Sequence, residues 1–278
     1  MRWTSSQRTT EIAPYSLVAE FYDHLMRHVN YERWASYVMS LFPLADDRQT
    51  RAATARARVT RVLELACGTG QMLVELAKAG FTVFGSDRSA AMLRVARQRL
   101  MREGRHANLW CGDMREVAAA VQVDAAICLY DSINYCLTPE DLQRVFKSVA
   151  QLVRGGGLFI FDICTQHNCS RNFRNYIERD ATSDFSYTRH AYYKAYKKLQ
   201  FNDFKIIDET NREQEYCERH IQRVYSIREM SEQFMANGLW QEVGRFSGMS
   251  RRPGQERAER VHFVLKRNAD IDQSNSSL

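Results

Sequence analysis

The chain has 278 residues, of which 45% are hydrophobic and 26% charged, and its net charge at neutral pH is +6. This composition is typical of a folded globular protein and excludes an intrinsically disordered chain. No stretch approaches the roughly 20 apolar residues of a membrane span, and the N-terminus lacks the apolar core of a secretory signal, so we expect a cytoplasmic protein that does not contact membranes.

The seven cysteines and the basic residues are spread without a recognisable framework. An odd number of cysteines with irregular spacing indicates reduced thiols. Cys164, His167 and Cys169 lie close in sequence, but a zinc site usually needs four ligands in paired short spacings, so we predict no metal site. Excess positive charge lies at 51–61 and 189–198, where solvated faces are the favoured interpretation over an RNA-binding surface.

The N-terminal part of the chain predicts two helices. Apolar residues recur at helical spacing over 17–29, and a second helix is expected from Tyr31 to about Phe42, before Pro43. Residues 44–60 are polar and rich in arginine, which predicts a connection. The first fourteen residues are expected to form a frayed tail.

From residue 62 onward, strand and helix patterns alternate. Thr138 and Pro139, followed by two acids, form a typical helix start. Such alternation predicts a parallel sheet covered by helices on both faces. The expected strands are 62–65, 82–85, 108–111, 125–130 and 158–163, and the expected helices are 71–78, 90–102 and 139 to the glycines at 155–157.

The segment after the fifth strand breaks this rhythm. It is rich in aromatic residues with partial alternation, so we expect inserted antiparallel strands that form a lid or side sheet. A helix from Arg228 to about Asn237 and two strands near 240–246 and 260–266 then return the chain to the core. The last ten residues are expected to form a second frayed tail.

The first predicted strand ends in a glycine turn, since the sequence from Val62 to Gly70 is VLELACGTG. Glycines there let the backbone pass close to a ligand, and ligands of open α/β sheets bind beyond the carboxyl ends of the strands. A dinucleotide fingerprint needs a third glycine where this chain has Leu73. The glycine turn alone is therefore weak support for a nucleotide site.

Two acids follow the next two strands. Asp87 can accept hydrogen bonds from both ribose hydroxyls of an adenosine, and Asp113 is placed to receive the adenine amine. For each acid alone, a loop residue or a helix cap is an equally good interpretation. Three successive strand ends with suitable chemistry together predict an adenosine site.

The order ELACGTG, GSD, GDM and LYDSINY resembles the class I S-adenosylmethionine (SAM) dependent methyltransferases. The LYDSINY ending is similar to a small-molecule subgroup with an antiparallel insert after the fifth strand, as are FYD in the first helix and ERVHF near the end. The resemblance spans about 15–266. It implies a doubly wound, Rossmann-like α/β sheet of seven strands with an inserted antiparallel β lid, and SAM as cofactor.

The resemblance also implies a division of the chain and a set of site residues. The segments are 1–60, N-terminal helices that cover the cofactor site; 61–163, the SAM-binding core; 164–226, the lid; 227–268, completion of the core sheet; and 269–278, a disordered tail. The implied cofactor-binding residues are Tyr15, Tyr22, Tyr31, Glu64, Ala66, Gly68, Gly70, Asp87, Met92, Asp113, Met114 and Leu129. Glu64 and the turn would hold the methionyl part, and the tyrosines would close over the cofactor.

Methyl transfer from SAM depends mainly on alignment of the acceptor and exclusion of water. A base is needed only where the acceptor is an ammonium or an alcohol. Asp131 and Asn134 follow the fourth strand, where the acceptor should meet the methyl group, and are the candidate catalytic residues. For Asp131 a role in its own turn is favoured, and for His190 and His220 a structural role is favoured.

The sequence therefore predicts a monomeric or homodimeric enzyme that methylates an N or O atom of a small-molecule acceptor. One alternative is a tRNA or RNA methyltransferase that uses 189–198 against phosphate, although no RNA-binding module is recognisable. The others are a catalytically silent SAM-binding regulator and a nicotinamide enzyme with a degenerate fingerprint.

Overall fold

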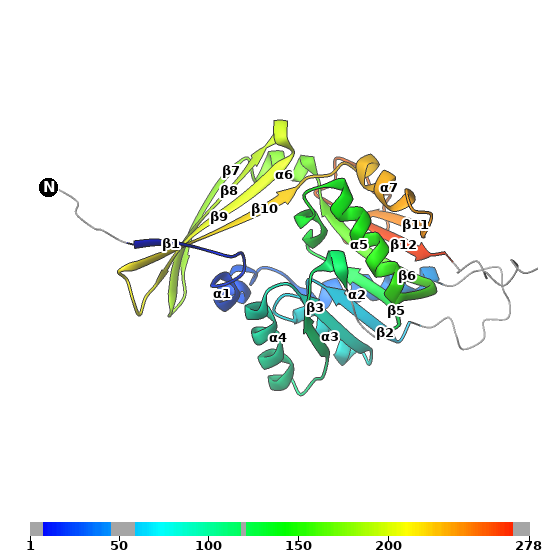
Figure 1. Cartoon of the computed structure of the whole chain (residues 1–278), viewed down its shortest axis with the longest axis horizontal. Helices are drawn as coiled ribbons and strands as arrows, with labels where there is room; N and C mark the ends of the chain where they lie inside the picture. The colour runs from blue at the N-terminus through cyan, green and yellow to red at the C-terminus, as the bar shows by residue number, and fades with distance from the viewer. Residues whose placement is uncertain (1–7, 46–58, 118–120, 269–278) are drawn as a thin grey trace, which may run out of the picture.

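Within the residues that the computed structural model describes, 8–45, 59–117 and 121–268, the chain forms a seven-stranded core sheet and a five-stranded second sheet (Figure 1). The core strands are β2 (Arg61–Leu65), β3 (Thr82–Asp87), β4 (Asn108–Cys111), β5 (Val123–Cys128), β6 (Val153–Cys164), β11 (Trp240–Ser247) and β12 (Arg260–Arg267). Their order is β11-β12-β6-β5-β2-β3-β4. Strands β2 to β6 pair in parallel, whereas β12 runs antiparallel to both of its neighbours.

Helices cover both faces of the core sheet, as the alternating pattern predicts. They are α2 (Tyr31–Leu41), α3 (Gln71–Lys78), α4 (Ala90–Arg102), α5 (Pro139–Leu152) and α7 (Ile227–Met235). Because successive strand residues point to opposite faces, Val62 packs in one apolar cluster with α2, α3 and α4, and its neighbour Leu63 packs in another with α5 and α7. The predicted doubly wound architecture is therefore confirmed.

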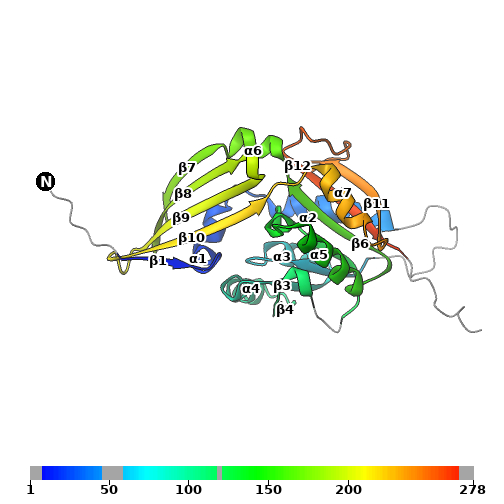
Figure 2. The ribbon, with the colours of Figure 1, turned by 45° about the horizontal axis from the view of Figure 1, so that its top comes forward.

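The second sheet is an antiparallel insert between β6 and α7, as predicted. Its strands are β7 (Asn175–Ala181), β8 (Phe185–Lys194), β9 (Leu199–Asp208) and β10 (Gln214–Arg223), with β1 (Arg8–Ile12) added in parallel beside β10. Helix α1 (Val18–Leu25) lies between this sheet and α4 (Figure 2). The ring of Phe21 in α1 stacks on Tyr187 of β8, with centroids 4.8 Å apart.

Three sequence predictions are corrected by the structure. Residues 8–12 are not a frayed tail, because they pair with β10 near the other end of the chain. A short helix, α6 (Gln166–Asn172), opens the insert where only strands were expected. Strand β6 begins at Val153 and runs through the glycines that were expected to end the preceding helix. A Cβ on Gly157 would lie 2.6 Å from the Asp124 carbonyl oxygen, so only glycine permits this close approach.

Other sequence predictions fall on residues outside the described ranges. These are most of the connection at 44–60, most of the basic stretch at 51–61, the first seven residues and the C-terminal tail 269–278. Among the described residues, no helix combines the length and apolarity that a bilayer crossing requires.

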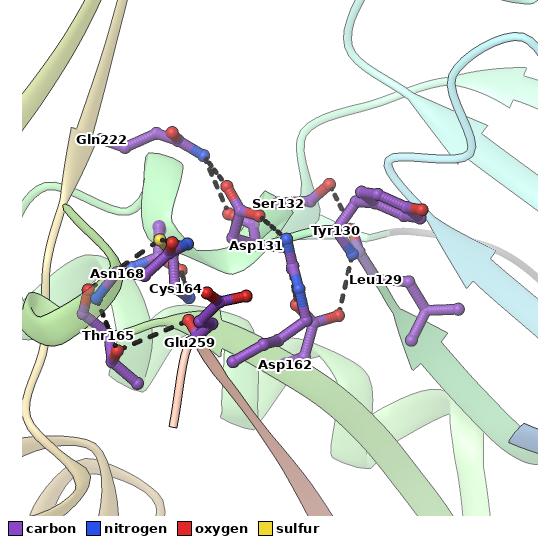
Figure 3. Close-up of polar contacts among 12 residues, drawn as sticks. Leu129, Tyr130, Asp131, Ser132, Asp162, Cys164, Thr165, Asn168, Gln222 and Glu259 are labelled. Atoms are coloured by element: carbon purple, nitrogen blue, oxygen red, sulfur yellow. Dashed lines mark hydrogen bonds and ion pairs between the residues drawn. The ribbon is translucent and has the colours of Figure 1, made fainter. Parts of the chain in front are cut away.

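Asp162 of β6 determines the turn that follows β5 (Figure 3). Tyr130 and Asp131 both adopt the left-handed region, with φ of 58° and 50°. This conformation costs about 1–2 kcal/mol for each non-glycine residue. Their amides donate to the two carboxylate oxygens of Asp162, at 2.8 and 2.9 Å, and Arg260 of β12 forms an ion pair with the same carboxylate. Because Asp162 is fully buried, these bonds hold the turn in its strained form.

We expect Asp162→Ala to destabilise the protein by about 3–5 kcal/mol, because two buried amides lose their acceptor and Arg260 loses a buried partner. Urea unfolding followed by circular dichroism measures the change. The control is Asp180→Ala, whose carboxylate pairs with Arg27 at the surface and should matter less. Equal stability of the two variants would contradict the structural role of Asp162.

Candidate functional site

A cavity of about 200 Å³ lies between the second sheet, α1 and the carboxyl ends of β5 and β6. Parallel strands bring their carboxyl ends to one edge, and this is where open α/β sheets bind ligands. The polar lining residues from the core are Tyr130, Asp131, Tyr135 and Arg260, and those from the second sheet are Arg189, Gln200, Asn202, His220 and Gln222. Asn168 of α6 and His28 complete the polar lining. Tyr15 and Tyr22 close the cavity from the side of α1.

Beside this cavity, the glycine turn between β2 and α3 has the left-handed conformations that its sequence predicts. Ala66, Gly68 and Gly70 have φ of 51°, 53° and 77°. No atom lies within 4 Å of the position of a Cβ on Gly68, so the backbone is open there to a ligand. Asp87 is fixed against the turn, because it accepts hydrogen bonds from the Gly68 amide at 2.9 Å and the Ser89 amide at 2.8 Å. The glycine turn and Asp87, the acid at the end of β3, therefore lie side by side.

Glu64, at the end of β2, carries a buried carboxylate. It is 5% exposed, and its Oε2 has no hydrogen-bond partner among the described residues. Burial, with a smaller contribution from Asp87, raises the pKa of Glu64 well above its usual value. A buried carboxylate oxygen without a partner is costly, and a cationic ligand group would satisfy it. The site thus fits the amino group of a bound methionyl moiety.

Helix α1 is attached to the glycine turn by Asp23, which sequence reasoning did not single out for this role. Its carboxylate accepts hydrogen bonds from the Thr69 hydroxyl at 2.8 Å and the Gln71 amide at 3.3 Å, and it forms an ion pair with Arg99 of α4. The Ser89 hydroxyl donates to the Tyr15 carbonyl oxygen at 2.8 Å. These contacts bring the segment with the predicted Tyr15 and Tyr22 to the cofactor side.

The residues expected around adenine and the methionyl chain lie near the same edge. Met92 and Leu129 are buried, and Met114 packs against the core. Asp113 already has a partner, because Arg115 donates to both of its oxygens and lowers the pKa of its carboxyl group. Its contact with an adenine amine stays a prediction.

Tyr31 opens α2 and lies near Tyr130, with ring centroids 6.0 Å apart. Burial and the carboxylates of Asp23 and Glu64 raise the pKa of Tyr31. The third predicted tyrosine therefore lies within the electrostatic reach of the acids on the cofactor side.

The two candidate catalytic residues have different surroundings. Asp131 lines the cavity, where its Oδ1 lies 2.7 Å from the Arg260 guanidinium and its Oδ2 accepts from the Gln222 amide at 2.6 Å (Figure 3). Burial raises the pKa of Asp131, and Arg260 opposes this shift. Asn134 is fully buried, donates to the Arg223 carbonyl and accepts from the Cys164 amide. Asn134 does not line the cavity, and we do not propose it as a catalytic group.

Cys164 and Cys169 lie at the edge of the cavity with their sulfurs 3.4 Å apart, and both are free thiols. The side-chain amide of Asn168 donates to the Cys164 sulfur, and the Cys169 thiol donates to the side-chain oxygen of Gln200. His167 does not join them, and the described part of the chain contains no cluster of three or more His, Cys, Asp and Glu residues suited to a metal ion.

A network that sequence reasoning missed joins the cavity to the second sheet. The Tyr15 and Tyr135 hydroxyls lie 2.7 Å apart, and the Tyr135 hydroxyl is 3.0 Å from Nδ1 of His220. Glu218, two residues before His220 on β10, accepts the amides of Tyr15 and Val18 at 2.7 and 3.0 Å. No sequence signal could pair these groups, because Glu218 is about 200 residues from the amides that it caps.

Comparisons with known proteins agree with this geometry. Residues 62–157 match a family model described as a methyltransferase domain. The putative methyltransferase YqeM of Bacillus subtilis is 29% identical over 78% of this chain and 83% of its own length. A dTDP-3-amino-3,6-dideoxy-alpha-D-glucopyranose N,N-dimethyltransferase of Streptomyces fradiae is 31% identical over 52% of each chain.

The fold is also similar to that of a solved protein. A SAM-dependent methyltransferase from Clostridium acetobutylicum superposes with a TM-score of 0.74 at 22% identity, covering 92% of this chain and 99% of the other. The matched domain contains the glycine turn and both strand-end acids, so residues 62–157 form a methyltransferase domain. Together with the similarity to YqeM, this domain makes the chain a SAM-dependent methyltransferase, and SAM is its cofactor.

Proposed function

We propose that this methyltransferase transfers the methyl group of SAM to an N or O atom of a small-molecule acceptor held in the cavity described above. The supporting observation is the size and lining of that cavity, which at about 200 Å³ suits a compact molecule. Four carboxamides line it beside tyrosine rings, namely Asn168, Gln200, Asn202 and Gln222. Such a lining can hydrogen-bond an acceptor that carries several polar groups.

On the cofactor side, the proposed contacts follow from the acids at the strand ends. Glu64 pairs with the amino group of the methionyl part, and Asp87 accepts from the ribose hydroxyls with the lone pairs that its two amide contacts leave free. Ala66, Gly68 and Gly70 let the backbone approach.

The remaining cofactor contacts are proposed from position and polarity. Met92, Asp113 and Met114 flank the adenine, Leu129 packs beside the methionyl chain, and Tyr15, Tyr22 and Tyr31 close the site. SAM, when bound, supplies a methyl group on a positively charged sulfur. The protein contributes alignment and exclusion of water, for which the cover formed by α1 and the second sheet is suited.

Asp131 is proposed to orient the acceptor. Its two oxygens already bind Arg260 and Gln222, so it offers remaining lone pairs to a donor group of the acceptor and is not a free base. Whether the transferred methyl goes to N or O depends on which acceptor atom reaches this corner of the cavity.

The surroundings of the basic stretch 189–198 favour a small acceptor over RNA. Arg189 points inward, donates to Asn202 and lines the cavity. Lys194 packs over the Tyr192 ring, and Lys198 pairs with Glu229. These cations are therefore engaged within the protein, whereas an RNA-binding surface needs cations that can neutralise phosphates. The cytoplasmic location and the monomeric or homodimeric state stay predictions.

The proposed function is tested with purified protein and methyl-tritiated SAM, using an amino sugar, an α-amino acid and a phenol as probe acceptors. We expect label in at least one small molecule, at a rate that changes less than about threefold between 50 and 200 mM salt, because no row of phosphates is contacted. Bulk tRNA serves as the comparison. Label in tRNA alone, with a steep loss of rate over the same salt range, would support the RNA alternative.

Asp87→Ala should weaken the binding of S-adenosylhomocysteine by about 10- to 150-fold, the range for losing a hydrogen bond to a charged group. Isothermal titration calorimetry gives the dissociation constants. Asp184→Ala, on the exposed turn between β7 and β8, is the matched control and should leave them unchanged. An unaltered constant in the Asp87 variant refutes the ribose contact.

Glu64→Gln should stabilise the free protein and weaken cofactor binding about tenfold or more. Burial raises the pKa of Glu64 above its unfolded value, so the stability provided by its protonated form is lost as the pH rises toward the native pKa. Glutamine does not ionise, so the gain in melting temperature should widen from about pH 4.5 upward. Glu75→Gln, on the surface of α3, is the control and should alter neither property.

A further inference from the structure

A chain of polar contacts leads from the cavity wall into the second sheet. The Tyr15 hydroxyl contacts the Tyr135 hydroxyl at 2.7 Å, and Tyr135 contacts Nδ1 of His220 at 3.0 Å. On the other side of the ring, Nε2 of His220 lies 3.3 Å from Oε2 of Glu218, in ion-pair range although not in aligned hydrogen-bond geometry. Tyr15, Tyr135 and His220 line the cavity, whereas Glu218 is buried behind them.

The Glu218 carboxylate, at the buried end of these contacts, determines which group donates in each hydrogen bond. A carboxylate only accepts, so Glu218 favours a proton on Nε2 of His220 and leaves Nδ1 as the acceptor. The Tyr135 hydroxyl must then donate to Nδ1, and Tyr15 donates to Tyr135. The second lone pair of the Tyr135 oxygen stays available to a molecule in the cavity.

Other ionisable side chains share the cavity with the His220 imidazole. Besides Tyr15, Tyr135 and Glu218, the charged side chains that line the cavity are Arg189 of β8, Asp131 after β5 and Arg260 of β12. The other titratable lining groups are Tyr22, His28, Tyr130 and Cys164. Arg189, Asp131 and Arg260 each make polar contacts of their own with other residues. Burial raises the pKa of Tyr135, so its hydroxyl remains protonated and suited to pass protons on without ionising.

We propose that Tyr135 accepts the proton that the methyl acceptor loses, while His220 takes the Tyr135 proton at Nδ1 and Glu218 stabilises the resulting imidazolium. The inference rests on the proposed function. In this step the acceptor lone pair forms the new bond to the methyl carbon, the carbon–sulfur bond breaks, and its electron pair stays on sulfur as a neutral thioether. His220 then returns its proton to solvent after product release. Glu218 does not touch the acceptor and is a positioning residue.

The relay also narrows the acceptor class. An ammonium or hydroxyl acceptor must lose a proton, so a relay that accepts protons helps it to react. A neutral amine that reacts without losing a proton gains nothing from such a relay. The acceptor class that we infer is therefore a primary or secondary amine that arrives protonated, or an alcohol.

The first test uses the protein bound to S-adenosylhomocysteine, with histidine ring nitrogens labelled with ¹⁵N, and needs no acceptor. We expect neutral His220 to carry its proton on Nε2, with Nδ1 unprotonated and its chemical shift altered in Tyr135→Phe. His220→Gln assigns the signal. A neutral ring with its proton on Nδ1 could not receive the Tyr135 proton and would overturn the relay.

The second test measures single-turnover transfer to whichever of the three probe acceptors the wild-type protein methylates. His220→Gln should slow transfer by about 10²–10⁴-fold and remove the rise of the rate with pH, with S-adenosylhomocysteine affinity unchanged within about threefold. Glu218→Gln keeps one of the two oxygens that accept the amides of Tyr15, Leu17 and Val18, and it should slow transfer less.

The matched control is His190→Gln, a histidine on strand β8 of the same sheet whose ring contacts Asn175, and it should transfer at the wild-type rate. A wild-type rate and pH profile in His220→Gln would exclude the relay and leave the proposed function intact. Absence of both cofactor binding and transfer in the wild-type protein would instead count against the proposed function.

Discussion

The buried carboxylate of Asp162 is the constraint on which the site depends. It binds the amides of two successive left-handed residues, Tyr130 and Asp131, and so sets the direction of the chain where β5 ends. Arg260 of β12 forms ion pairs with both Asp162 and Asp131. Its guanidinium also lies over the rings of Trp34 and Tyr130. One carboxylate thus fixes the core wall of the cavity.

The two sides of the site differ in charge. The cofactor side has the buried acids Glu64 and Asp87, with an unpartnered oxygen on Glu64, which suits a ligand that is cationic at its amino group and at sulfur. On the acceptor side, Asp131 is paired with Arg260, and Arg189 is bound to Asn202. Because the charges on the acceptor side are already paired, this side selects an acceptor by its hydrogen bonds more than by its net charge.

Helix α1 joins these two sides. Its apolar face packs on the second sheet through Phe21, its start is capped by Glu218 of that sheet, and Asp23 attaches it to the glycine turn. The second sheet and α1 therefore form a common cover for the glycine turn and the cavity.

The sequence by itself determined the features that repeat over short distances: the alternating elements, the glycine turn and the acids at successive strand ends, such as Asp87. Hydrophobic periodicity and local turn chemistry encode these features directly. Only the tertiary structure decided that residues 8–12 form a strand, that Arg260 and Gln222 bind Asp131, and that His220 meets Tyr135. These contacts join residues far apart in the chain, which leave no periodic pattern, so their geometry exists only once the two sheets have packed around α1.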